Sequence, residues 1–197
     1  MKKEIWPGGA LLAPVPPALV SCGSVEKPAV LTVGWTGIVN TRPPRTYVSI
    51  RPERNSYPMI KESGEFVINL PPARLARAVD LCGCRSGRQV DKFSLAHLTA
   101  TPASAVSAPL IAECPVSLEC RVFQSILLGS HEMFLADILA VQVDAALLDD
   151  AGRLCLERAD LLAYAHGGYF RLGEQLGSFG YSVRKKKKRR PLPHKKG

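Results

Sequence analysis

The chain has 197 residues, of which 46% are hydrophobic, with 16 glycines and 16 prolines. This length predicts one ordinary domain, and the frequent glycines and prolines favour short strands and turns over a helical bundle. The net charge of +9 comes from one end, because residues 184–197 hold nine Lys and Arg and no acid, which leaves 26 − 9 = 17 basic against 17 acidic residues in the rest.

A formally neutral body argues against a nucleic-acid-binding domain, and a run of like charges is usually a solvated terminus. No apolar run approaches the ~20 residues that span a bilayer, and Pro14, Pro16 and Pro17 interrupt the early apolar stretch that a secretory signal needs. The six cysteines are scattered and lack the spacing of a zinc site. We therefore expect a cytoplasmic protein without a metal or a membrane segment.

The first part of the chain contains an arm followed by three predicted strands. Residues 1–17 form a charged, proline-rich arm, and residues 18–23 a short apolar strand. The β-branched runs Val30–Val33 and Thr46–Ile50 predict two more strands around a middle rich in glycine and proline, which we interpret as a loop.

The remaining elements are also short. Ser56 is a candidate N-cap, and we predict a helix from it to about residue 63, followed by a strand over 65–70 and an amphipathic helix over 74–81. A loop is predicted over 96–108, and strands over 116–124 and 131–148. A turn at 149–152 then leads to a return strand over 154–156. Many short antiparallel strands with few helices predict a mainly β barrel with peripheral helices and a ligand at its mouth.

Polar side chains gather where the two early strands end. They are Thr36 and Asn40 after the first strand, and Ser49, Arg51, Arg54 and Ser56 around the end of the second. Hydroxyl, amide and guanidinium groups suit a phosphate dianion and a polar ring edge. Ile50, Trp35 and Tyr57 suit a flat aromatic body. We interpret this stretch as the main half of a flavin mononucleotide (FMN) site, with core packing as the alternative for Trp35. Further along the chain, His131 is a candidate for the same site, with a structural role as the alternative.

Other cofactor sites lack their motifs in this chain. No Gly-x-Gly-x-x-Gly follows a strand, and no Walker-type Gly-Lys-Ser/Thr is present. No acid–base pair stands out either, which agrees with a flavin, because the flavin itself accepts the hydride and the protein supplies placement and access.

Several segments in order resemble the flavin reductase-like family of FMN-binding split barrels, and within it the flavoredoxin branch. They are 20–23 (Val-Ser-Cys-Gly), 31–38, 47–52, 56–57, 65–70, 86–87 with 91–93, 129–131 and 168–173, within a match over roughly residues 14–181. The resemblance implies an antiparallel Greek-key split barrel that forms a homodimer, with one FMN per subunit near the dimer interface.

The resemblance also implies roles for individual residues. Thr36 and Asn40 would contact the ring edge and the ribityl chain, and Ser49, Ile50 and Arg51 would line the ring and the chain. Arg54, Ser56 and Tyr57 would lie toward the phosphate end. Ser86, Gly87 and Lys92 would form a second clamp on the phosphate or the ring, and His131 would lie near the reactive face. One departure is Cys82-Gly-Cys84 with Arg85, which adds thiols and charge beside the second clamp.

The sequence thus predicts an arm over 1–17, an FMN-binding domain over 18–181 and a basic tail over 182–197. The predicted function is that of an FMN-dependent oxidoreductase, which accepts electrons from NAD(P)H or a protein donor and passes them to a flavin, ferric iron or a redox protein. A non-enzymatic FMN electron carrier, or a module whose basic tail binds nucleic acid, are the alternatives.

Overall fold

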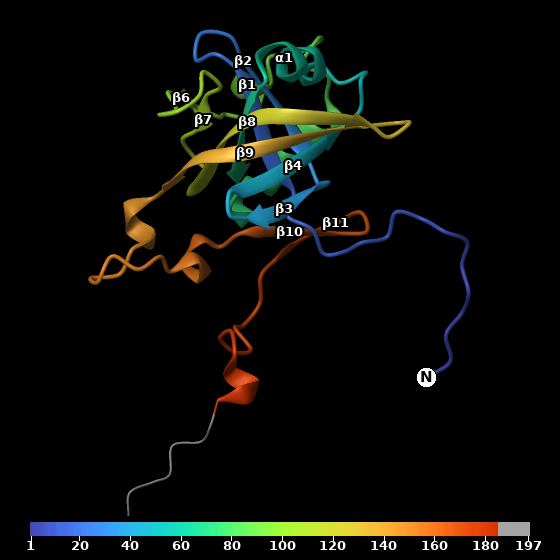
Figure 1. The fold of residues 1–197 in the computed structure, drawn as a ribbon, viewed down its shortest axis with the longest axis vertical. Helices are drawn as coiled ribbons and strands as arrows, with labels where there is room; N and C mark the ends of the chain where they lie inside the picture. The colour runs from blue at the N-terminus through green and yellow to red at the C-terminus, as the bar shows by residue number, and fades with distance from the viewer. Residues whose placement is uncertain (185–197) are drawn as a thin grey trace, which may run out of the picture.

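Seven antiparallel strands form one sheet in the structure, a computed structural model that describes residues 1–184 (Figure 1). Their order across the sheet is β2-β1-β5-β8-β9-β4-β3. The strands are β1 (Ala18–Gly23), β2 (Pro28–Val33), β3 (Thr36–Thr41), β4 (Pro44–Ile50), β5 (Glu65–Leu70), β8 (Val116–Leu127) and β9 (Glu132–Val143). Two-stranded pairs join β6 (Ala100–Thr101) to β7 (Leu110–Ile111) and β10 (Leu162–Ala165) to β11 (Gly168–Arg171).

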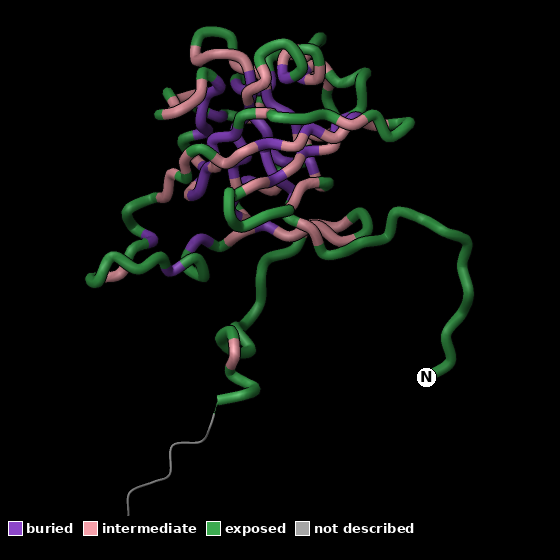
Figure 2. Tube along the Cα trace, in the orientation of Figure 1, coloured by how far each residue is buried: buried purple, intermediate pink, exposed green. Residues whose placement is uncertain are grey.

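The sheet curls until its two ends share one core. Leu31 and Val33 of β2, at one end of the order, pack in the same buried cluster as Val48 of β4, near the other end. Phe66 and Phe134 fill the centre of this cluster and are at most 1% exposed. Figure 2 shows the buried residues concentrated inside the curled sheet. The fold is therefore the mainly β, antiparallel Greek-key split barrel that the sequence predicted.

The barrel is split between β2 and β3. These strands are the two ends of the hydrogen-bonded order, although only Gly34 and Trp35 separate them in sequence. The Ser49 N–H donates to the Trp35 carbonyl at 3.0 Å, which ties this short link to the end of β4. The backbone hydrogen bonding of the barrel is therefore interrupted between β2 and β3, where the polar ends of the strands meet.

Short helices cover the barrel. They are α1 (Ser56–Ser63), α2 (Ala76–Cys84) and α3 (Lys92–Leu95), with 3₁₀ turns η1 (Ala73–Leu75), η2 (Ala145–Leu147), η3 (Leu156–Ala159) and η4 (Tyr181–Val183). Because successive strand residues face opposite sides, β1 places Val20 in the barrel and Leu19 outside it, where Leu19 packs with Val79 of α2 and Phe93 of α3. No helix within residues 1–184 has the length and apolar character required to cross a membrane.

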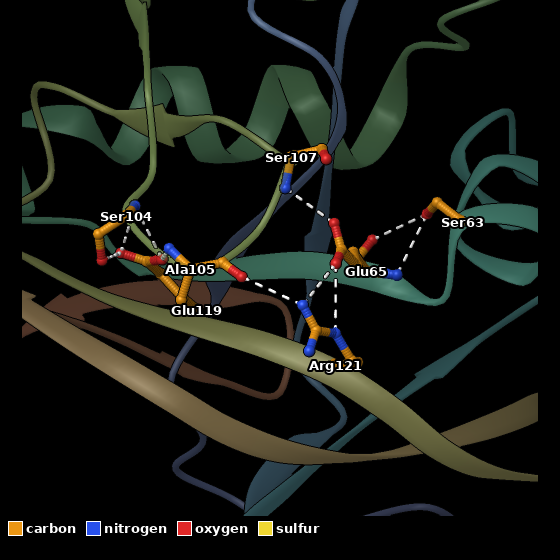
Figure 3. Close-up of polar contacts among 7 residues, drawn as sticks. All are labelled: Ser63, Glu65, Ser104, Ala105, Ser107, Glu119 and Arg121. Carbon is orange, nitrogen blue, oxygen red and sulfur yellow. Dashed lines mark hydrogen bonds and ion pairs between the residues drawn. The ribbon is translucent and has the colours of Figure 1, made fainter.

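Buried and half-buried carboxylates attach the loop after β6 to the sheet (Figure 3). Glu119 is fully buried and accepts hydrogen bonds from the N–H groups of Ser104 and Ala105 and from the Gln142 amide. Glu65 accepts from the Ser107 N–H and pairs with Arg121 at 3.1 Å. These contacts satisfy polar groups that would otherwise be buried without partners.

Five sequence predictions of local structure are corrected. The predicted loop over 96–108 contains β6. The segment after Val33 is not only a loop, since it contains β3. Asn55, not Ser56, is the N-cap of α1, and its side chain makes no capping bond. The strand predicted to reach residue 148 ends at Val143. The return strand over 154–156 is reduced to one bridge between Leu148 and Leu154.

Candidate functional site

Two neighbouring pockets lie along β2, on the side where the barrel is split. The β2–β4 pocket, of about 230 Å³, is lined by residues 31–35, Ser49, Ile50, Arg51, Arg54 and His131. The β2–α3 pocket, of about 390 Å³, is lined by residues 28–30, Asn55 and residues 87–92. Their linings adjoin in sequence at Val30–Leu31 of β2 and at Arg54–Asn55 of the loop before α1.

The β2–β4 pocket combines an aromatic wall with cations. The Trp35 and His131 rings lie with their centroids 4.5 Å apart at 44°, and Trp35 is 46% exposed. Arg51 and Arg54 are exposed at the rim: the Arg51 guanidinium lies 3.6 Å from the Glu53 carboxylate, and Arg54 donates to the Gly83 carbonyl at 3.0 Å. An exposed aromatic face beside two guanidinium groups suits a flat ring with an anionic substituent.

Burial lowers the pKa of His131, and Arg51 and Arg54 add to this effect, while Glu53 opposes it. The Ser130 hydroxyl lies 2.9 Å from His131 Nδ1, within hydrogen-bond distance. Because the pKa lies below its ordinary value of 6.5, the imidazole is neutral at pH 7. His131 therefore offers an aromatic face and a hydrogen bond here, and the positive charge of the pocket comes from the arginines.

Lys92 is the buried cation of the β2–α3 pocket. It is 7% exposed, and its ammonium donates to the carbonyls of Val30 at 3.0 Å and Cys82 at 2.7 Å. Within residues 1–184 it makes no ion pair with a carboxylate. Burial is the main cause that lowers its pKa. A buried ammonium with two neutral acceptors retains one N–H and an uncompensated charge, both of which suit an anion.

The loop around Lys92 brings its backbone close to the pocket. At Gly87 a Cβ atom would lie 2.9 Å from Asn55 Nδ2, so a side chain at this position would displace the Asn55 amide. Asp91 lines the same pocket, but its carboxylate caps α3 by accepting from the N–H groups of Phe93 and Ser94. Arg88 is exposed on the same loop. The lining therefore holds two cations, Arg88 and Lys92, against one carboxylate that is already bonded to the start of α3.

The structure brings eight of the residues chosen from the sequence into these two pockets. They are Trp35, Ser49, Ile50, Arg51, Arg54 and His131 in the β2–β4 pocket, and Gly87 and Lys92 in the β2–α3 pocket. Ser86 lies immediately before Gly87 and accepts from the Arg88 N–H.

The other chosen residues lie outside these two pockets. Thr36 donates to the Tyr47 carbonyl at 2.6 Å, and Asn40 donates to the Pro43 carbonyl at 2.8 Å in the β3–β4 turn. Ser56 is buried at the start of α1, where its carbonyl accepts from the Cys22 thiol. The Tyr57 hydroxyl donates to the buried carboxylate of Glu132, which also pairs with Lys61 at 3.1 Å.

Sequence reasoning missed Asn55 as a pocket residue. Asn55 is adjacent in sequence to the chosen residue Arg54 and belongs to no recognisable motif, so its position beside Arg54 was the available signal. Residues 31–33 of β2 and the adjoining Gly34 were also missed, because an apolar strand reads as core although one of its edges borders the split.

The curled sheet and the cationic cleft at its split define a split barrel of the flavin reductase-like type. Residues 11–173 match the flavin reductase like domain family, and the chain belongs to this family. An uncharacterized protein of Archaeoglobus fulgidus is 34% identical over 149 residues, which cover 76% of this chain and 84% of the relative. The FMN reductase (NADH) RutF of Acinetobacter baylyi is 26% identical over 104 residues, 53% of each chain.

Solved structures give the same fold. Flavoredoxin of Desulfovibrio vulgaris superposes with a TM-score of 0.85 at 30% identity, covering 93% of this chain and all of that chain. Flavoredoxin of Methanosarcina acetivorans gives 0.83 at 26% identity with the same coverage. The FMN-binding protein of Thermus thermophilus, solved with bound 1-cyclohex-2-enone, gives 0.74 at 25% identity and covers 90% of this chain and 97% of that chain.

Proposed function

We propose that this chain is an FMN-dependent oxidoreductase that accepts electrons from NAD(P)H and passes them through bound FMN to a flavin, a ferric complex or a redox protein. The observation that carries the proposal is Lys92, a 7% exposed ammonium without a carboxylate partner in the described part of the chain, in a pocket beside the one that Trp35 lines. A ring linked to a phosphate has both the aromatic and the anionic part that these two neighbouring pockets suit.

The residues present fit FMN in two parts. The β2–β4 pocket would hold the flavin ring against Trp35 and His131, with Ser49, Ile50 and Arg51 along its edge. Arg54 joins the two pockets, and Gly87 and Lys92 would receive the phosphate. Asn40, Ser56 and Tyr57 stay sequence predictions, because their polar groups already bond to protein or lie outside both pockets.

Bound FMN supplies the hydride and electron chemistry. The residues of this chain bind and orient it. The arginines and Lys92 neutralise its phosphate, and the neutral His131 adds no further positive charge beside the ring. The exposed face of Trp35 leaves an approach for a donor or an acceptor.

Two alternatives use the same fold differently. A non-enzymatic electron carrier would bind FMN but would not react with NADH or NADPH. A nucleic-acid module would depend on the basic tail, which lies outside the described residues from Lys185 onward. One relative favours the reductase, since it is an NADH-dependent FMN reductase by name.

The test is titration of the purified protein with FMN, followed by anaerobic stopped-flow mixing with NADH and with NADPH. We expect a yellow complex that bleaches with at least one nicotinamide. Binding without bleaching would support the electron carrier instead. A protein that binds no FMN would refute both flavin hypotheses, and lost polyanion binding after deletion of residues 184–197 would then favour the nucleic-acid module.

We further propose a cytoplasmic homodimer of this domain, in which residues 18–181 are the FMN-binding unit. Apolar side chains along β8 and β9 are exposed in the single chain, among them Phe123 at 42%, Leu127 at 72% and Val141 at 54%. Such side chains are frequent at subunit interfaces. Analytical ultracentrifugation should give a mass near twice 21.3 kDa; a monomer at micromolar concentration would contradict this proposal.

A further inference from the structure

A second cleft lies on the other side of Trp35, beneath the N-terminal arm. It consists of two connected lobes of about 400 and 490 Å³, which we call together the arm pocket. Leu11, Leu12, Val15, Gly34 and Trp35 line both lobes. Clefts of this size that are lined mainly by apolar side chains are typical small-molecule sites.

The arm is fixed where it crosses the barrel. The Val15 N–H donates to the Tyr164 carbonyl of β10, and the Tyr164 N–H donates to the Val15 carbonyl, both at 2.9 Å. Figure 1 shows the arm passing beside the β10–β11 hairpin before it leaves the body. Leu11 is 59% exposed and Leu12 86%, so both have apolar surface that a ligand could cover.

The arm pocket differs in charge from the other two. None of the described residues that line it is Arg, Lys, Asp or Glu, and its titratable side chains are Tyr47, Tyr164 and His166. The β2–β4 and β2–α3 pockets, in contrast, hold Arg51, Arg54, Arg88 and Lys92. An anion entering the arm pocket would lose hydration without gaining a cationic partner, whereas a neutral apolar molecule would not.

We propose that the arm pocket binds a neutral, flat cyclic dione of the quinone type, which is an electron acceptor of this protein beside those proposed above. The proposal rests on the FMN-dependent function proposed above, because Trp35 forms a wall of both the arm pocket and the β2–β4 pocket. NAD(P)H and one solvent proton supply the two electrons and two protons that convert the quinone to a hydroquinone, and NAD(P)⁺ is released. The charge-free lining selects against anionic acceptors such as free FMN.

The test follows the NMR signal of the Trp35 indole N–H and needs no flavin. The chain has two tryptophans, so a Trp6→Phe background leaves Trp35 as the single indole resonance. The probe is duroquinone, whose substituted ring does not add thiols, and the matched anion is trimethylbenzoate. We expect duroquinone to shift the Trp35 indole resonance of flavin-free protein, and trimethylbenzoate to bind at least about tenfold more weakly because its charge is desolvated.

Two variants of the arm distinguish the pocket from non-specific binding. Leu11→Asp places a carboxylate in the lining and should weaken duroquinone about tenfold, because a charge beside an apolar ligand must lose water. Ile5→Asp makes the same change on the same arm at a 97% exposed residue outside the pocket, and should have no effect. Both variants should keep the FMN affinity of the background protein, which also verifies folding.

Equal effects of the two variants, equal binding of duroquinone and trimethylbenzoate, or an unmoved Trp35 resonance would each overturn the arm pocket as a quinone site. In turnover with NADH, Leu11→Asp should raise the KM for duroquinone with little change in kcat, and an unchanged KM would overturn the acceptor role. Failure of the wild-type protein to bind FMN would instead refute the proposed function, and the Trp35 titration would still decide whether the pocket binds quinones.

Discussion

Substitution of Lys92 by methionine is the sharpest perturbation of the proposed phosphate site. Methionine keeps a long apolar stem of similar volume and removes the ammonium, which is 7% exposed and bonded to the carbonyls of Val30 and Cys82. A hydrogen bond from a charged group contributes about 1.5–3 kcal/mol. We therefore expect Lys92→Met to weaken FMN binding by about 2 kcal/mol, or about thirtyfold in Kd.

The assay is quenching of flavin fluorescence in parallel titrations with FMN and with riboflavin, which lacks the phosphate. Lys92→Met should weaken FMN and leave riboflavin nearly unchanged. Arg88→Met is the matched control, because Arg88 lines the same pocket but is exposed, where a charge contact contributes less than about 1 kcal/mol.

Two results would refute this reasoning. An equal loss of affinity for FMN and riboflavin would mean that Lys92 supports the fold of the site and not the phosphate. An unchanged FMN affinity in a folded variant would mean that the phosphate lies elsewhere, in which case the guanidinium groups of Arg51 and Arg54 become the candidates.

Four further changes test other parts of the structure. Since burial lowers the pKa of Lys92 below 10.5 and binding needs its charged form, FMN affinity should fall as pH rises through that lowered pKa, and Lys92→Met should lack this alkaline limb in a pH series of titrations. Gly87→Ala should weaken FMN by about 1 kcal/mol, because the added methyl displaces Asn55; calorimetry that shows native affinity would exclude this contact. Cys82→Ser should keep the rate of flavin reduction in stopped flow, since the thiol is fully buried and hydride chemistry belongs to the flavin; a folded variant without turnover would assign the thiol a redox role. Glu119→Gln should lower the free energy of unfolding by about 2–3 kcal/mol in urea, because its amide group opposes the donors of Ser104 and Ala105, and a native value would contradict that network.

The pH dependence of Glu119 provides an internal check on that last change. Burial raises its pKa, but the hydrogen bonds from Gln142, Ala105 and Ser104 lower it more, so the folded pKa lies below 4.5. A carboxyl with a lowered folded pKa stabilises the protein above its unfolded pKa, and this stability is lost as pH falls through the folded pKa. The destabilisation caused by Glu119→Gln should therefore shrink in acid.

Local sequence patterns were sufficient to predict the bounds of elements whose apolar side chains face the core at regular intervals. β1 and β5 have the predicted bounds, and α1 ends where the pattern ends. β3 was missed because glycine, asparagine and the following prolines dominate the segment, and its last four residues are exposed, so burial leaves little pattern there. The β10–β11 hairpin was missed because strands of four residues around His166-Gly167 carry too few alternating positions.

The site could be predicted where its residues follow one another along the chain and less well where tertiary packing selects them. Ser49 and Ile50 end β4 and Arg51 follows it, so a single sequence stretch places all three in one pocket. Tyr57 belongs to the same stretch, but the helix turns its hydroxyl toward Glu132, which is 75 residues away in sequence. Such a partner cannot be read from local sequence, and the same holds for the two carbonyls that hold Lys92.

The two residues between β2 and β3 also suggest a way to redesign the protein. Gly34 and Trp35 join opposite margins of the sheet, and the ligand cleft opens beside them. Because β2 and β3 are not hydrogen-bonded to each other, the length of this two-residue link limits how far these two edges of the sheet can separate. Inserting one or two glycines there would provide an adjustable spacer, by which the entrance could be widened in steps to admit larger aromatic compounds.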